Sequence, residues 1–438
     1  MRFHFISENG ESLPIAYRLL QTGYEVAVNI WNTQNKRFGL YKNMIDVQYG
    51  IPSEAELDKD TIYIFDMTGQ GDFAKKLILK GYKVIGGHDF CDRIEKNRLY
   101  GMQLAEKLGL RVPQYFTFNG MAEYREKQKI IPSGKWVLKF DDTDVTTTII
   151  AEQNEITEVL EEMLGNKQIQ ENTSFIIQRY VKGVEISTEA WFSHSKILFP
   201  LNSTFEDKRL LAGNVGPNTG CAGSVIFAYQ EDEPRLYRAL FKTLQFFMRI
   251  MDYTGPIDIN SIISEEDHHA YFLEFTPRFG YNAVYGFLDM LDIDRGYFFR
   301  MLAEGGLDRI PIKYRWNCCI HTYLLPAPLH TEIYDPATKK IINPARDVVI
   351  KLKEPKLESA LWMPDIYYDG KNIVTAGSWG AVADVSGCGN TKDEAITKAY
   401  EYTKLIKIPQ LCYRNDVGAR VSTQVVDFLN KFHYNIPI

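Results

Sequence analysis

The first part of the chain, residues 1–113, alternates short apolar runs with amphipathic segments. The apolar runs predict buried strands at residues 1–7, 24–30, 61–66 and 82–86. Leu13, Ile15, Ala16 and Leu19 follow helical spacing, and further helices are predicted at residues 71–80 and 93–108. Alternation of strands and helices indicates a parallel sheet, so we expect an α/β domain that ends near Pro113.

The rest of the chain is richer in strand patterns. Strands are predicted at residues 136–140, 174–180, 185–192, 196–200, 224–227, 257–263 and 270–275. Helices are predicted at residues 153–164, 234–251 and 392–406. The chain is therefore expected to combine α/β and α+β architecture in three domains, at residues 1–113, 114–310 and 311–438.

Charge and cysteine content narrow the class of protein. Lys and Arg number 50 against 56 Asp and Glu, a formal net charge of -6, which argues against broad nucleic-acid binding but allows a local basic pocket. The six cysteines form no CxxC pair, which favours reduced thiols. The sequence begins with no signal-peptide pattern, and no apolar run reaches the ~20 residues of a membrane-spanning helix. We therefore expect a soluble cytoplasmic protein.

A lone cation interrupts one predicted strand. Lys139 lies in the apolar run 136–140 and is followed by Asp141 and Asp142. A charged side chain on a buried strand needs a partner, and a phosphate group would serve. An edge lysine whose stem packs on the sheet, with its ammonium in water or a salt bridge, would give the same pattern.

A short turn joins the strands predicted at residues 174–180 and 185–192. Backbone groups at such a turn could bond an adenine edge, and Glu185 could accept from ribose hydroxyls. Strand–turn–strand segments with a glutamate are common, so this pattern alone does not establish a nucleotide site.

Two acidic residues lie inside apolar strands that form a predicted hairpin. Asp258 lies in the run Ile-Asp-Ile, and Glu274 in Phe-Leu-Glu-Phe. Buried carboxylates are costly unless they are paired or bind a metal, and Mg²⁺ prefers carboxylate oxygens. The alternative is that both carboxylates point to solvent.

Residues 213–220, GNVGPNTG, are predicted to form a loop because glycine and asparagine are typical of turns. Glycines allow backbone N–H groups to approach an anion closely, and Lys208 and Arg209 would add positive charge. An ordinary surface loop has the same composition.

Several strings occur in a characteristic order along the chain. From the N-terminus to the C-terminus they are YKVIG at residues 82–86, GPNTG at residues 216–220, EFTPRFG at residues 274–280 and YRNDVG at residues 413–418. In this order they resemble the ATP-grasp family, and within it the phosphoribosylamine–glycine ligases, which carry GPNTGG-, EFNxRFG- and CRxDIG-type segments. The resemblance covers nearly the whole chain and implies an ATP-grasp fold with a preceding parallel-sheet domain and a β-rich C-terminal domain.

The resemblance also implies roles for individual residues. The nucleotide would be contacted by Arg98, Lys139, Gln178, Arg179, Tyr180, Val181 and Glu185. Mg²⁺ (or Mn²⁺) would be bound by Asp258, Glu274 and Thr276. The substrates would face Lys208, Arg209, Asn214, Asn218, Thr219 and Arg278.

Some positions depart from the family pattern. Residues 141–148, DDTDVTTT, replace the glycine-rich phosphate loop, and Thr276 replaces an asparagine metal ligand. Tyr281-Asn282-Ala283 replaces Asp-Pro-Glu, and the N-terminal glycine-rich turn is reduced to Asn9-Gly10-Glu11-Ser12. These changes put the substrate pair in question more than the fold.

Three functions follow from the resemblance. The first is an ATP-dependent ligase that joins a carboxylate to an amine through an acyl phosphate, as in purine biosynthesis or with another acid and amine. The second is a non-catalytic nucleotide-binding protein, which the altered phosphate loop favours. The third is another ATP-grasp activity, a carboxylation or a kinase reaction. For the ligase we expect small-molecule substrates, no membrane partner, and a monomer or homodimer.

Overall fold

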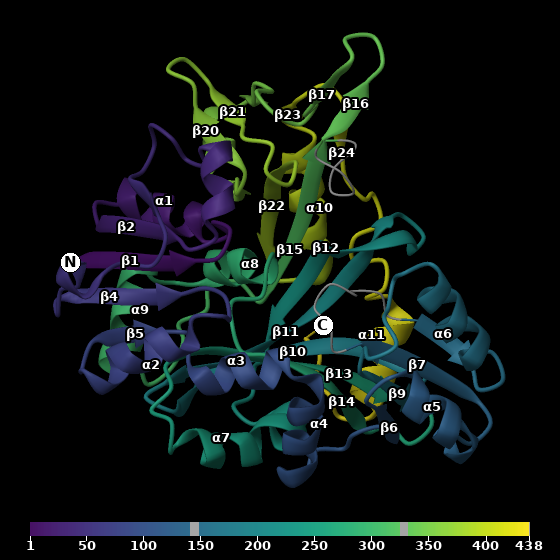
Figure 1. Cartoon of the computed structure of the whole chain (residues 1–438). Coiled ribbons are helices and arrows are strands. Elements are labelled where there is room, and N and C mark those ends of the chain that lie inside the picture. The colour runs from purple at the N-terminus through teal and green to yellow at the C-terminus, as the bar shows by residue number, and fades with distance from the viewer. Residues whose placement is uncertain (141–148, 325–331, 438) are drawn as a thin grey trace. The chain divides into compact units, whose positions relative to one another are not determined.

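The computed structural model describes residues 1–140, 149–324 and 332–437 of the chain. These residues form two compact units. The larger unit consists of residues 1–91, 187–258 and 276–438, apart from the undescribed positions, and the smaller unit of residues 92–186 and 259–275. Figure 1 labels the helices and strands, which carry the same labels below.

A parallel sheet begins the larger unit, as the sequence predicts. Its strands run in the order β3-β2-β1-β4-β5 (Figure 1): Val47–Tyr49, Glu25–Ile30, Arg2–Ser7, Thr61–Phe65 and Lys83–Ile85. Helices α1 (Leu13–Gln21) and α2 (Gly71–Leu79) connect its strands. Ile6, Tyr63, Phe65, Leu77 and Val84 form a core cluster between sheet and helix because alternate strand residues and the apolar helix face point toward each other.

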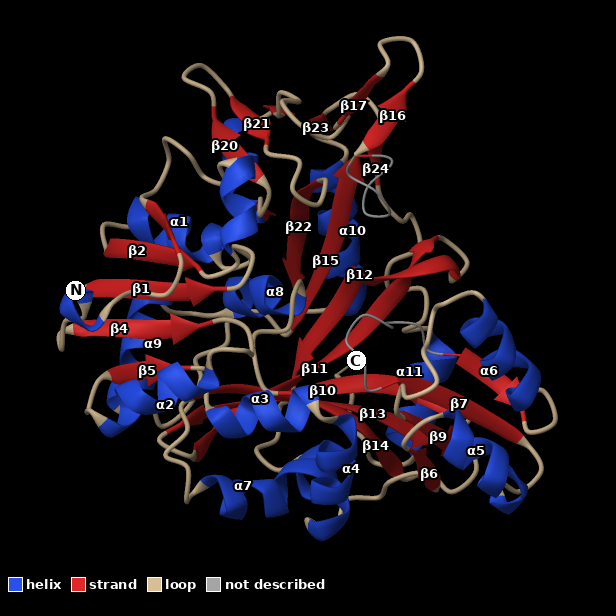
Figure 2. Ribbon diagram, viewed as in Figure 1, coloured by secondary structure: helices blue, strands red, loops and turns tan. Residues whose placement is uncertain are grey.

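Long antiparallel strands form the second sheet of the larger unit. The order there is β10-β11-β12-β15-β22-β19 (Figure 2): Gly183–Ser193, Lys196–Leu211, Val215–Ala228, Trp316–Leu324, Ala381–Gly389 and Leu361–Trp362. Strand β24 (Leu411–Cys412) pairs with β15. Short turns join β10 to β11 and β11 to β12, which suits antiparallel pairing, whereas longer segments connect β12 to β15 and β15 to β22.

Helices cover both faces of this second sheet. Helix α8 (Ala283–Met290) packs on one face, where a Cβ on Gly286 would lie 2.3 Å from the Asn317 amide oxygen. Helix α10 (Lys392–Thr403) packs on the other face, where a Cβ on Gly387 would lie 2.4 Å from the Ala399 nitrogen. Glycine at these two positions lets helix and sheet approach closely.

The remaining elements of the larger unit are shorter. Its helices include η1 (Thr33–Phe38), η2 (Glu54–Glu56), α7 (Lys242–Met248), α9 (Arg295–Glu304), η5 (Pro355–Ala360) and α11 (Thr423–Lys431). Paired short strands are β16 with β17 (Ile333–Asp335, Lys340–Ile342), β18 with β23 (Lys351–Leu352, Ile406–Lys407) and β20 with β21 (Ile366–Tyr368, Ile373–Thr375).

The smaller unit contains an antiparallel sheet in the order β6-β9-β7-β8: Tyr115–Phe118, Phe175–Arg179, Lys135–Phe140 and Ile149–Glu152. Helices α4 (Arg98–Lys107), α5 (Met121–Lys127) and α6 (Ile156–Gly165) belong to it, with η3 (Gln128–Ile130). Trp136, Leu138, Phe175 and Ile177 lie in its core cluster with α5 and α6 residues, so one face of the sheet is covered. Strands β13 (Gly255–Ser264) and β14 (Ala270–Thr276) form the predicted hairpin.

Two predicted helices were wrong in their extent. The helix expected at residues 93–108 is divided into α3 (Asp89–Lys96) and α4 because Asn97 leaves helical geometry and its side chain accepts from the Tyr100 N–H at 2.8 Å. The helix expected at residues 234–251 is a π-helical turn, η4 (Tyr237–Phe241), followed by α7. Continuous helical spacing in the sequence did not reveal either irregularity.

Over the described residues, none of the helices combines the length and apolar character that a membrane span requires. All six cysteines occur as free thiols.

Candidate active site

One face of the four-strand sheet in the smaller unit carries Lys139 and Gln178. Trp136 and Leu138 point into the core, so Lys139 points to the opposite face of β7 and pairs with Ile176 of β9. Gln178, which lies opposite Val137, shares this face. The structure therefore brings together the predicted phosphate-contacting lysine and the first predicted adenine-contacting residue.

The side chain of Gln178 fits a nucleotide base. Gln178 is 1% exposed, and its amide nitrogen and oxygen both lack a hydrogen-bond partner among the described residues. A buried amide without partners is costly. An adenine edge, which presents a donor beside an acceptor, would satisfy both atoms.

The backbone after Gln178 is already partly bonded. The Arg179 N–H donates to the Gln114 carbonyl at 2.7 Å, and the Tyr180 N–H donates to the Lys135 carbonyl at 3.1 Å. The Arg179 guanidinium donates to the Ser133 carbonyl at 2.9 Å. The Arg179 side chain thus stabilises the turn before β7, and these two backbone N–H groups are not available to a base.

The turn that follows is narrow. Val181 and Glu185 are half-buried, with Glu185 in the first part of β10. A Cβ on Gly183 would lie 2.0 Å from the Ile263 carbonyl oxygen, so only glycine fits there. The roles of Val181 and Glu185 toward a nucleotide stay predictions.

Glu274 meets Arg98 and Asn260 within the smaller unit. One Glu274 oxygen lies 3.0 Å from the Arg98 guanidinium, and the other accepts from the Asn260 side-chain nitrogen at 3.5 Å. The Asn260 side-chain oxygen is buried and has no partner among the described residues. Carboxylate and amide oxygens are ligands that Mg²⁺ accepts, so this pair fits a metal ion bound with phosphate.

Asn260 was not predicted from the sequence. Like Asp258, Asn260 is a polar residue inside the apolar run 257–263, and this is the signal in the sequence that points to it. Polar residues on a buried strand are uncommon unless they have a partner or a ligand.

Asp258 is the last residue of the segment 187–258, which belongs to the larger unit. It is 9% exposed and accepts a hydrogen bond from the Ser187 hydroxyl. Burial raises the pKa of Asp258 to about 8, with a further contribution from the Glu189 and Glu206 charges, against the lowering effect of Ser187. A nearby cation would be needed to keep this carboxyl ionised at neutral pH.

The three predicted metal ligands are divided between the units, Asp258 and Thr276 in the larger and Glu274 in the smaller. Among the described residues, the structure contains no group of three or more His, Cys, Asp or Glu side chains that could hold a metal ion. The metal assignment stays a prediction. Residues 141–148, where the phosphate loop is predicted, lie outside the described residues.

The segment predicted as a loop at residues 213–220 is mostly strand, which corrects that prediction. Strands β11 and β12 form a hairpin in which Arg209 pairs with Asn218. Gly213 and Asn214, with φ of 76° and 58°, form the turn, and left-handed backbone at both positions suits a tight hairpin. The glycines and asparagines of this segment correctly predicted a turn at residues 213–214, but they did not predict that the residues from Val215 onward are extended.

Cationic and polar side chains line this hairpin. Lys208 is 30% exposed and lies 3.4 Å from Glu206. The Arg209 guanidinium donates to the Gly216 carbonyl at 2.7 Å, and the Thr219 hydroxyl to the Lys208 carbonyl at 3.3 Å. Asn214 and Asn218 are exposed. The Arg209 guanidinium is therefore used within the hairpin, and the roles of Lys208, Asn214, Asn218 and Thr219 toward a substrate stay predictions.

Arg278 follows β14 and donates to the Phe279 carbonyl at 2.9 Å. The Phe279 N–H donates to the Asp66 carbonyl at 3.2 Å, which fixes this segment to the end of the N-terminal sheet. The approach of Arg278 to a substrate stays a prediction.

The C-terminal string at residues 413–418 supports the hairpin from the other face of the sheet. The Arg414 side chain is 1% exposed, lies 2.8 Å from Asp416 and 3.5 Å from Asp207, and donates to the Arg209 carbonyl at 2.9 Å. The Gly418 N–H donates to Asp207 at 3.1 Å. This string therefore stabilises the strand that carries Lys208.

An acidic pair that the sequence did not suggest lies at the carboxyl edge of the parallel sheet. Asp66 follows β4 and accepts from Ser7 at 2.6 Å and from the Ser12 N–H at 3.0 Å. Glu11 accepts from the Ser7 hydroxyl at 3.2 Å. Burial and the Glu11 charge raise the pKa of Asp66, which outweighs the lowering by these hydrogen bonds.

Because the folded protein retains a proton on Asp66 that the unfolded chain loses at lower pH, this group should make stability fall as pH rises through the acidic range toward neutrality. The change in the free energy of unfolding caused by Asp66→Asn should therefore be more favourable at pH 8 than at pH 5, by about 1 kcal/mol or more. Denaturant unfolding at both pH values measures this, with exposed Asp60→Asn as control. Equal effects of Asp66→Asn at both pH values would contradict the assignment.

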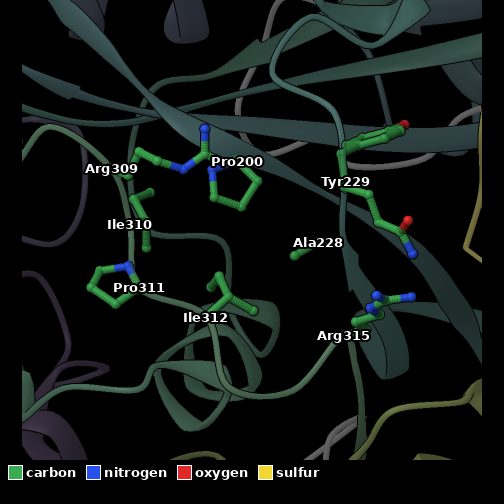
Figure 3. A pocket seen from close by; sticks show the side chains of 9 residues that line it. Pro200, Ala228, Tyr229, Arg309, Ile310, Pro311, Ile312 and Arg315 are labelled. Atoms are coloured by element: carbon green, nitrogen blue, oxygen red, sulfur yellow. The ribbon is translucent and has the colours of Figure 1, made fainter.

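A pocket of about 670 Å³ lies elsewhere in the larger unit (Figure 3). Arg309 and Arg315 lie on opposite sides of it, with Tyr229 and Pro200 on its wall. It adjoins the end of β12 remote from the hairpin tip and contains none of the predicted site residues. We assign it no part in the reaction.

The sequence is similar to proteins of one enzyme family. Residues 96–283 match the family described as phosphoribosylglycinamide synthetase, ATP-grasp (A) domain. The phosphoribosylamine–glycine ligase of Thermotoga maritima is 24% identical over 430 residues, covering 95% of this chain and 99% of that protein. That of Helicobacter pylori (strain J99) is 24% identical over 349 residues, covering 78% and 77%.

Solved structures show the same fold. The crystal structure of phosphoribosylamine–glycine ligase from Thermotoga maritima matches with a TM-score of 0.71 at 20% identity, covering 95% of this chain and 100% of that chain. Biotin carboxylase from Campylobacter jejuni matches with a TM-score of 0.64 at 12% identity, covering 98% and 96%. The chain therefore has the fold of these proteins and is similar in sequence to the phosphoribosylamine–glycine ligases, in one case over 95% of its length.

Proposed function

We propose that this protein is an ATP-dependent carboxylate–amine ligase that works through an acyl phosphate. The observation that carries the proposal is the buried face of the smaller sheet, where Lys139 lies beside the unsatisfied amide of Gln178. The similarity to ligases of the same reaction class over 95% of the chain supports it. A protein that had lost nucleotide binding would gain nothing from a buried amide without partners.

In the proposed reaction the substrate carboxylate attacks the γ-phosphorus of ATP, and the amine then displaces phosphate from the acyl phosphate. Positioning and cancellation of charge are the main requirements of the first step. Gln178 would bind the base, Lys139 the phosphates, and Lys208 a substrate carboxylate or the transferring group. Bound Mg²⁺ would supply further charge neutralisation, with Glu274 and Asn260 as its protein ligands in the smaller unit.

The substrate pair of the relatives, phosphoribosylamine and glycine, is the first to be tested. We expect Mg·ATP to give ADP only when both an acid and an amine are present, measured by coupled ADP release with glycine and freshly generated phosphoribosylamine and with a panel of other pairs. ADP formation with a different pair would retain the ligase reaction and change the substrates. ATP binding without ADP formation across the panel would contradict the proposal and favour a non-catalytic nucleotide-binding protein.

A further inference from the structure

A chain of hydrogen bonds crosses the α8 face of the larger sheet. The Ser224 hydroxyl donates to the Asn282 side-chain oxygen at 2.8 Å, and the Asn282 side-chain nitrogen donates to Asp384 at 2.7 Å. His321 Nδ1 lies 2.9 Å from the same Asp384 oxygen. His321 and Asp384 are direct neighbours in the β15–β22 register. All four residues belong to the larger unit.

This arrangement selects one tautomer of His321. Asp384 is 3% exposed and, as a carboxylate, can only accept, so His321 Nδ1 carries a proton. The basic nitrogen is then Nε2, which makes no hydrogen bond to the described residues. The His321 side chain is 21% exposed, and its ring stacks near Tyr323 with centroids 6.1 Å apart. The ring is thus held in place with its basic nitrogen reachable from solvent.

The His321–Asp384 pair shares a sheet face with Lys208. One row across the sheet consists of Glu206, Ser224, Cys319 and Ser386. Because side chains alternate along each strand, His321 and Asp384, each two residues from this row, point to the same face as the row. The register of β11 shifts between Asp207 and Arg209, so alternation does not fix the direction of Lys208. Its ion pair with Glu206, at 3.4 Å, places the Lys208 ammonium on the side of this row.

Several titratable groups surround the His321–Asp384 pair. Burial lowers the pKa of His321, but the charge and hydrogen bond of Asp384 outweigh it, so the pKa is raised above the ordinary value. Burial raises the pKa values of Tyr285 on α8 and of Cys221 and Cys319 on the sheet, so all three are neutral at pH 7. The further anions that act on these groups include Glu206, Asp289, Glu11 and Asp66.

We propose that His321 is the general base that removes a proton from the amine substrate, with Ser224, Asn282 and Asp384 as positioning residues. The inference rests on the proposed ligase function. One ammonium proton moves to Nε2, and the freed nitrogen lone pair forms the C–N bond to the acyl carbon. The C–O bond to phosphate then breaks, and the second proton lost by the nitrogen leaves with inorganic phosphate as hydrogen phosphate. A built-in base implies that the amine is of the alkylamine class, which is protonated at neutral pH and cannot attack until it loses a proton.

The test compares two nucleophiles in wild type and His321→Asn. Hydroxylamine is neutral at pH 7 and traps an acyl phosphate as a hydroxamate without a base. With the alkylamine substrate, His321→Asn should lower kcat by about 100-fold or more, whereas ATP-dependent hydroxamate formation should change less than about threefold. Asp384→Asn should lower kcat in the same selective way. We expect the kcat of wild type to rise with pH and to level off once His321 is neutral, whereas the kcat of His321→Asn should keep rising until the amine itself loses its proton.

His194→Asn is the matched control, because His194 forms a 3.1 Å pair with Asp252 at the surface and should change neither reaction. Thermal unfolding checks that each variant is folded. Equal losses with both nucleophiles, or no loss with the amine, would overturn the role of His321. Absence of both hydroxamate and ADP in wild type would instead overturn the ligase function, and the inference with it.

Discussion

Glu274→Gln is expected to lower ATP-dependent turnover by about 100-fold or more while leaving the protein folded. The change removes the charge of the carboxylate that lies beside Arg98 and Asn260 and keeps the shape of the side chain. A neutral amide would bind Mg²⁺ poorly, so less Mg²⁺ would be bound to cancel the phosphate charge. Steady-state ADP release measures turnover, and the Mg²⁺ concentration that gives half-maximal rate should increase.

Glu265→Gln is the control for Glu274→Gln. Glu265 lies in the turn of the same hairpin and pairs with Lys182 at 2.8 Å at the surface. Its replacement should leave turnover and Mg²⁺ dependence unchanged, because exposed ion pairs contribute little. Normal turnover in Glu274→Gln would rule out Glu274 as a metal ligand.

Arg414→Met is expected to destabilise the protein by about 3–5 kcal/mol. Methionine fills part of the volume but leaves Asp207, which is 2% exposed, without its buried cation. The hydrogen bond to the Arg209 carbonyl is lost as well, so the hairpin that carries Lys208 should loosen. Denaturant unfolding measures the stability loss, and ADP release should fall in parallel because Lys208 is no longer held.

Arg300→Met provides the comparison. Arg300 is 47% exposed and pairs with Glu304 one helical turn away, so its loss should cost less than about 1 kcal/mol. If Arg414→Met costs no more than Arg300→Met, the C-terminal string does not support the hairpin.

The local pattern of the sequence was sufficient for most elements near the site. The apolar run at residues 136–140 predicted the strand, and the structure then placed Lys139 on the face opposite Trp136 and Leu138. The predictions were weaker where a single side chain ends an element. Asn97 divides one predicted helix because it caps the N-terminus of α4. The helical spacing of apolar residues continues past Asn97, so the pattern did not predict this division.

The hairpin at residues 213–220 shows a different limit. Its glycines and asparagines predicted a turn, and Gly213 and Asn214 do adopt left-handed backbone. The residues beyond the tip are extended because β12 pairs with β11 along its length, and this pairing is a tertiary interaction that outweighs the turn preference of the segment.

The sequence by itself determined most of the strands and helices, the parallel sheet at the start, and Glu274 as a carboxylate inside an apolar strand, because these depend on spacing within a few residues. Gln178 was a candidate through the family resemblance. Only the tertiary structure decided that Asn260 joins Glu274, that Arg414 supports Asp207, and that His321 meets Asp384. Each of these contacts depends on the register between separate strands or segments. Register is set by packing of the whole sheet, which no local spacing encodes.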